Sequence, residues 1–228
     1  MTTILQMKRF LTALATLFSL KATAAPQVTM VDPKSLLYSL ATINDALPAT
    51  EPTPPEKGDL ILHEDDWRQF EAVSTSLRPQ IESELADIRK IFAENSVPLG
   101  QGRAFKKLHV RSRIPNPIVS SVLWAELLKA LDITDPKSGV AFRQDGAVKG
   151  GFSLRVAELS VYGVREGDRV HTVALINTWT PRLSAVQAER LAAFLEKNGL
   201  ILVHWYSGTI LEGKSTLTQY FSQQEKPK

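Results

Sequence analysis

Apolar residues recur at helical spacing in three parts of the chain. The clearest helix is predicted over 77–95, where the apolar positions fall on one face and the charged positions on the other. A second helix is expected to begin at Ser120 or Ser121, before a run of leucines. A third is expected to open at Ser184, which starts a capping-box pattern, and to close at Gly199.

Between these helices the pattern is that of extended strands. Alternating or short apolar runs bounded by turn residues predict β-strands. The expected strands cover 67–73, 103–113, 152–156, 159–164, 170–179 and 200–206. Together these elements predict a single α+β domain of two layers, in which about three helices pack on a mainly antiparallel sheet.

The N-terminus has the three parts of a secretory signal peptide. Lys8 and Arg9 precede an apolar run from Phe10 to Leu20, and a small-residue site follows at Ala22-Thr-Ala24. The run is shorter than the roughly 20 residues that a helix needs to cross a bilayer. We therefore expect residues 1–24 to be removed and the protein to be periplasmic. An uncleaved N-terminal anchor is the alternative.

Two further segments are expected before the globular body. Residues 25–47 are predicted to contain a short amphipathic helix that opens at Asp32-Pro33. Residues 48–58 are rich in proline and predict an extended linker, so the α+β body is expected to span 59–228. The helix is expected to pack on that body, or alternatively to dock on a partner or exchange in an oligomer. Its apolar stripe consists of Leu36, Leu40, Ile43 and Leu47.

Composition and charge exclude several classes of function. The chain has no Cys, which rules out disulfides, thiol nucleophiles and cysteine-ligated metals. The net charge of +3 comes from the signal peptide, whose Lys8, Arg9 and Lys21 have no acidic counterpart. The remainder is neutral, so nucleic-acid binding is not expected. The sequence contains no phosphate-binding loop or hydrolase motif, and no cofactor, metal site or transmembrane segment of the mature chain is predicted.

The densest group of positive charges lies in 103–113, where five of eleven residues are basic. If this segment is one strand, alternate side chains share a face. Such a row predicts a partner with an acidic surface, or alternatively pairing with Glu and Asp of neighbouring strands. The predicted partner-binding residues are Arg103, Phe105, Lys107, His109, Arg111 and Arg113.

A catalytic alternative depends on residues far apart in the chain. His171 and His204 lie in predicted strands, and imidazole can ligate metals or transfer protons near neutral pH. The carboxylates considered with them are Glu64, Asp66 and Glu158. Together they would form the site of an exported hydrolase or metal-dependent enzyme.

Three functions therefore remain open. The sequence favours an exported, non-enzymatic protein-binding module, such as an inhibitor or immunity protein that covers the active site of a toxin or enzyme. The first alternative is the exported enzyme, and the second is an envelope assembly or scaffold component. The sequence does not determine the identity of the partner or the oligomeric state.

Overall fold

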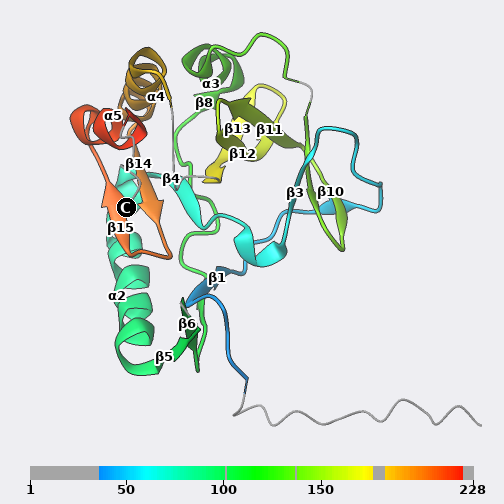
Figure 1. Cartoon of the computed structure of the whole chain (residues 1–228). Helices are drawn as coiled ribbons and strands as arrows, with labels where there is room; N and C mark the ends of the chain where they lie inside the picture. The colour runs from blue at the N-terminus through cyan, green and yellow to red at the C-terminus, as the bar shows by residue number, and fades with distance from the viewer. Residues whose placement is uncertain (1–35, 101, 137, 177–182, 223–228) are drawn as a thin grey trace, which may run out of the picture. The chain divides into compact units, whose positions relative to one another are not determined.

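The computed structural model describes residues 36–100, 102–136, 138–176 and 183–222 (Figure 1). The predicted signal peptide and the first part of the predicted amphipathic helix lie outside these ranges. The described residues form a mixed α/β fold with four α-helices and a mainly antiparallel sheet. The helices are α2 (Arg78–Asn95), α3 (Trp124–Leu131), α4 (Ala185–Lys197) and α5 (Lys214–Ser222). Two short 3-10 helices are η2 (Glu64–Asp66) and η3 (Thr75–Leu77).

A seven-stranded antiparallel sheet forms the centre of the described fold. Its strand order is β11-β12-β13-β4-β14-β15, and β8 pairs with the start of β13. The strands are β4 (Phe70–Ser74), β8 (Val122–Leu123), β11 (Gly151–Val156), β12 (Leu159–Glu166), β13 (Arg169–Ile176), β14 (Leu200–His204) and β15 (Thr209–Leu211). The sequence therefore predicted most of this sheet correctly.

Both faces of the central sheet are covered, so the predicted two-layer arrangement is wrong. Leu200 and Leu202 of β14 pack on one face with residues of α3, α4 and α5. Ile201 and Val203 point to the other face and pack with α2. Figure 1 shows α3, α4 and α5 together on one side of the central strands, with α2 running away from them. The apolar run from Leu200 to Val203 in β14 fits this burial on both faces.

Three smaller sheets complete the described fold. A four-stranded sheet has the order β2-β10-β9-β3, and it packs on the central sheet through Trp67, Phe142 and Tyr162. Its strands are β2 (Thr50–Glu51), β3 (Leu60–Leu62), β9 (Val140–Phe142) and β10 (Gly146–Val148). Two pairs of strands stand apart from it: β1 (Thr42–Asn44) with β7 (His109–Arg111) in parallel, and β5 (Ser96–Leu99) with β6 (Gly102–Phe105) as a hairpin.

The predicted amphipathic helix does not form over its described part. Residues 42–44 instead make strand β1, which pairs with β7. Thr42 and Ile43 are β-branched, and the backbone of β7 supplies the hydrogen-bond partners that an isolated helix would satisfy internally. The Asn44 side chain then accepts a hydrogen bond from the N–H of Ala46 and turns the chain.

The proline-rich segment 48–58 is also not a free linker. Thr50 and Glu51 pair with β10 at the edge of the four-stranded sheet. An edge strand tolerates neighbouring prolines because one of its sides needs no N–H donors. The compact unit accordingly begins at Leu37 rather than at Asp59.

Local sequence signals are confirmed where they are strongest. Helix α2 begins one residue after its predicted start and ends at the predicted Asn95. The N-cap of α4 is a complete capping box, in which the Ser184 hydroxyl accepts from Gln187 N–H and the Gln187 side chain accepts from Ser184 N–H. Among the described residues, no helix is both long and apolar enough to span a membrane.

Candidate protein-binding surface and the ion networks beside it

The segment 103–113 is not the single strand that its alternation predicts. It forms β6 and β7, which are separated at Lys106–Leu108. The N–H of Lys106 donates to the carbonyl of Asn95 at 2.8 Å, which ties this break to the end of α2. Because the alternation is interrupted here, residues before and after the break do not share one face.

The six predicted binding residues consequently lie in three environments. Phe105 is fully buried, with its ring centroid 4.9 Å from that of Phe92. His109 and Arg113 contact carboxylates of α2, and Arg111 contacts Glu71 of β4, so these three are paired internally but only Arg111 pairs with a strand residue. The remaining two, Arg103 and Lys107, are exposed and form no ion pair with a residue that the structure describes.

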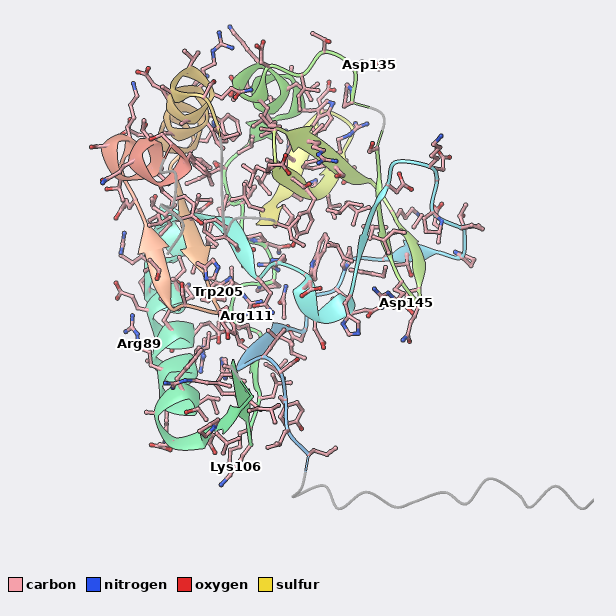
Figure 2. The ribbon with its side chains drawn as sticks, in the orientation of Figure 1. Arg89, Lys106, Arg111, Asp135, Asp145 and Trp205 are labelled. Carbon is pink, nitrogen blue, oxygen red and sulfur yellow. The ribbon has the colours of Figure 1, made fainter. Side chains whose placement is uncertain are left out.

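Arg111 belongs to a buried ion network centred on Glu71 of β4. Arg68 Nε lies 2.5 Å from one Glu71 carboxylate oxygen, and Trp205 Nε1 donates to the other at 2.8 Å. The Arg111 guanidinium lies 3.9 Å from Glu71 and 4.7 Å above the centre of the Trp205 ring (Figure 2). Burial lowers the pKa of Arg111 to about 10 although Glu71 opposes the change, so the guanidinium is charged at neutral pH.

Arg68 is held in this network by its backbone as well as its side chain. Its φ of 58° lies in the left-handed region, which non-glycine residues adopt rarely. The Arg68 N–H donates to the hydroxyl of Tyr162 at 3.1 Å, and its guanidinium donates to the carbonyls of Ile114 and Pro115. The Arg68 side chain thereby reaches Glu71, which lies three residues further along the chain. The bonds to Ile114 and Pro115 join the region of β4 to the segment after β7.

A second ion network lies between α2 and the end of β7. Glu84 is 1% exposed, and one of its oxygens accepts the N–H groups of Ser112 and Arg113. The other oxygen contacts His109 Nε2 at 2.5 Å and the Arg113 guanidinium at 3.0 Å. Arg113 also contacts Asp87 at 2.8 Å. This network fastens β7 to α2.

The second network has the residue types of a metal site. Ligand atoms of Glu84, Asp87 and His109 lie within 4.8 Å of one another. However, the Arg113 guanidinium already contacts both carboxylates and supplies the positive charge that a cation would bring. We therefore interpret the cluster as a structural ion network.

The Glu84 network predicts a loss of stability in acid. Burial alone would raise the pKa of Glu84, but the hydrogen bonds from His109 and Arg113 and their positive charges outweigh it, and the pKa lies below its usual 4.5. Its contribution to the free energy of unfolding is therefore complete above the unfolded-state pKa and is lost as the pH falls through the lower folded-state value. Urea unfolding from about pH 7 to pH 3 should show this loss, and Glu84→Gln should reduce it.

The control for this prediction is Glu158→Gln, which changes an exposed carboxylate in the turn between β11 and β12. Glu158→Gln should keep the wild-type pH dependence. An identical pH dependence in Glu84→Gln and wild type would mean that Glu84 does not carry the effect.

Five exposed cations lie on the C-terminal half of α2 and on segment 103–107, whereas other exposed cations without an ion pair, among them Lys57, Arg143 and Lys149, lie elsewhere in the described fold. The basic surface is defined here as Arg89, Lys90, Arg103, Lys106 and Lys107, all of them exposed. None of these five forms an ion pair with a described residue. Figure 2 shows Arg89 on the outer side of α2 and Lys106 beside the β5–β6 hairpin. Two of the six predicted binding residues, Arg103 and Lys107, therefore belong to the basic surface. The other three members of this surface are not among the predicted residues.

The other three members carry only weak signals in the sequence. Alternation along a single strand would place Lys106 on the face opposite Lys107, but the break between β6 and β7 leaves both residues exposed. Arg89 and Lys90 look like ordinary polar positions of an amphipathic helix. Only the packing of the hairpin against α2, through Phe92 and Phe105, brings the two groups together.

The catalytic alternative is not assembled among the described residues. His171 and His204 lie on β13 and β14, with β4 between these strands. His171 contacts Glu166 of its own hairpin at 3.8 Å. Burial lowers the pKa of His204, whose Nδ1 accepts the N–H of Ser207 at 3.1 Å and caps a turn.

The carboxylates proposed for the same alternative lie in separate places. Glu64 and Asp66 lie in η2, where His63 Nδ1 accepts the N–H of Asp65. Glu158 is paired with Arg155 at 3.8 Å in the turn after β11. The structure therefore shows no contact between these carboxylates and either His171 or His204.

Comparisons with known proteins add no relative: no protein family, no curated protein and no solved structure matches the chain.

Proposed function

We propose that this chain is an exported protein-binding module that covers an acidic surface of its partner, in the manner of an inhibitor or immunity protein. The observation that carries the proposal is the basic surface, whose five exposed cations have no carboxylate partner among the described residues. Like charges repel where they lie close together, as Lys106 and Lys107 do along the chain, and an opposing acidic surface relieves that repulsion. The predicted signal peptide is the reason for proposing export.

The distribution of charge over the rest of the described residues supports this proposal. Those residues hold more carboxylates than Lys and Arg together, yet the basic surface contains a net excess of positive charge. Five further cations pair with carboxylates, whereas Lys57, Lys129, Arg143, Lys149 and Arg169 are exposed and form no ion pair with a described residue. The pairs are Arg78 with Glu82 and Glu212, Arg155 with Glu158, Arg190 with Asp132, Lys197 with Glu126, and Lys214 with Glu189.

The framework beneath the basic surface is ordered by packing. The hairpin that carries Arg103 is packed on α2 through Phe105 and Phe92. The Glu84 network holds the following strand, β7, to the same helix. A surface that is already in place loses less conformational entropy when a partner binds.

Charge reversal tests the proposal directly. The triple variant Arg103→Glu, Lys106→Glu, Lys107→Glu should reduce recovery of the partner from the native envelope by at least about tenfold, because three attractive contacts become repulsive. Affinity capture with quantitative mass spectrometry measures recovery. Binding of the purified partner to the wild type should also weaken as salt concentration rises.

A matched control changes the net charge by the same amount elsewhere. Lys57→Glu, Arg143→Glu and Lys149→Glu replace three exposed cations outside the basic surface and should leave recovery unchanged. The proposal fails if both triple variants recover the partner equally well. It also fails if the cations of the basic surface retain nucleic acid or anionic lipid vesicles instead of a protein.

A further inference from the structure

An open groove of about 500 Å³ adjoins the basic surface, between α2 and the turn that joins β14 to β15. Helix α2 contributes Ile88, Arg89, Phe92 and Ala93, and the turn contributes Tyr206, Ser207 and Gly208. The groove therefore shares Arg89 with the basic surface.

The floor of the groove is aromatic and held in place. The rings of Phe92 and Tyr206 meet edge to face, with their centroids 6.0 Å apart. The buried ring of Phe105 packs against the ring of Phe92 and holds it in place. The facing turn is fixed by His204, whose Nδ1 accepts the Ser207 N–H. An apolar side chain could therefore enter a groove that is already formed.

The rim of the groove carries the positive charge of Arg89 beside the tight turn at Gly208. Arg89 forms no ion pair with any described residue, so its guanidinium can bind a carboxylate. Gly208 has a φ of 68°, and a Cβ at this position would lie 4.0 Å from Arg89 Nε. The positive φ favours glycine at this turn, and the ordinary contact distance shows that the turn lies beside the Arg89 side chain.

The lack of carboxylates in its lining distinguishes this groove from the one of about 680 Å³ between α3 and α4. In that groove, Glu126 pairs with Lys197 and Asp132 pairs with Arg190, and Lys129 is left without an ion pair to a described residue. The groove beside α2 has one cation and no carboxylate in its lining. Its charge therefore selects an anionic ligand.

We propose that the groove between α2 and the β14–β15 turn binds an acidic segment of the partner that carries a large apolar side chain. The apolar side chain packs on Phe92 and Tyr206, and a neighbouring carboxylate binds Arg89. This inference rests on the proposed function, because it names the part of the partner that the basic surface would attract. It places a buried apolar anchor beside a charged region, as in many protein interfaces.

Peptides of defined composition test the inference without the native partner. The probe is acetyl-Glu-Glu-Phe-Glu-amide, titrated into isotope-labelled protein and followed by NMR chemical shifts. We expect saturable shifts at the backbone amides of Phe92, Tyr206 and Gly208. Replacing Phe by Ser, or all Glu by Gln, should each weaken binding at least about tenfold, because the first removes apolar burial and the second removes the carboxylates.

Variants of the groove are paired with controls on the same protein. Arg89→Gln should weaken binding of the probe about tenfold, whereas Arg143→Gln, at an exposed cation in the turn after β9, should not. Ala93→Trp should fill the groove and abolish binding, whereas Ala86→Trp, at an exposed position outside the groove lining, should not. Equal affinity for the Phe and Ser peptides, or full binding by Ala93→Trp, overturns the inference.

The two proposals fail in different ways. If the charge-reversal variant loses the native partner while Arg89→Gln and Ala93→Trp keep it, the basic surface binds the partner and the groove inference is wrong. If the groove binds the probe as expected but charge reversal leaves partner recovery unchanged, the proposed function is wrong and the groove remains a peptide site.

Discussion

Replacing Glu71 with Gln is expected to lower the free energy of unfolding by about 3–5 kcal/mol. Glu71 is 1% exposed and is the carboxylate shared by two buried guanidiniums, those of Arg68 and Arg111. The amide keeps the shape of the side chain but removes the negative charge, which leaves two positive charges in the interior without compensation. Urea unfolding followed by tryptophan fluorescence and by circular dichroism measures the loss.

The matched control is Glu82→Gln on the exposed side of α2. Glu82 lies 3.7 Å from Arg78 in an ion pair that is open to solvent, and such pairs contribute little. Glu82→Gln should unfold at nearly the wild-type urea concentration. A Glu71→Gln protein as stable as this control would show that the buried guanidiniums do not depend on Glu71.

Replacing Gly163 with Ala should be at least as damaging, although it adds only one methyl group. Gly163 lies in the middle of β12, where a Cβ would overlap the carbonyl oxygen of Thr172 and lie 2.7 Å from its carbonyl carbon. The obstacle is the backbone of the neighbouring strand, so no side-chain rotation relieves it. We expect a loss of at least about 3 kcal/mol, at or above the upper end of the usual cost of overpacking, or no folded protein.

Gly102→Ala is the control, because it makes the same change in strand β6 where there is room. The nearest atom to a Cβ at position 102 is the carbonyl oxygen of Leu99, at an ordinary contact distance of 3.7 Å. This variant should be as stable as the wild type or slightly more stable, since alanine restricts the unfolded chain. If thermal unfolding places both variants at the wild-type midpoint, β12 and β13 cannot approach as closely as the structure shows.

The parts of the fold that could be predicted from the sequence are those fixed by local signals. Helix α2 has a complete apolar face, and α4 carries its own N-terminal cap, so neighbours along the chain determine both. The strands of the β11–β13 meander are joined by short turns, and a turn at Gly167 was visible in the sequence. The predicted mainly antiparallel sheet is confirmed for this reason.

The parts that could not be predicted depend on pairing between distant segments. Strand β1 is only three residues long, and it is a strand because β7 lies beside it. Its apolar spacing is that of a helix, and nothing nearby in the sequence reveals the competing partner. The same is true of β2, which is paired with β10 within a proline-rich stretch.

The same distinction, between local signals and contacts with distant segments, applies to single residues of the candidate site. Arg103 and Arg111 have similar neighbours in the sequence, yet one is exposed and the other is buried against Trp205. The difference arises from Glu71 of β4 and from Trp205, which directly follows β14. A count of charges could therefore identify 103–113 as unusual, but it could not divide the segment into internal ion pairs and free cations.

Because β4 lies between β13 and β14, it cannot form its pairings until both of these later strands have been synthesised. Strand β4 ends at Ser74, whereas its two neighbours span 169–176 and 200–204. A nascent chain that leaves the ribosome or a translocation channel N-terminus first must therefore hold β4 as an unpaired strand until most of its length has emerged. Chaperones would have to shield that strand meanwhile, and truncation before residue 200 should leave a product that aggregates.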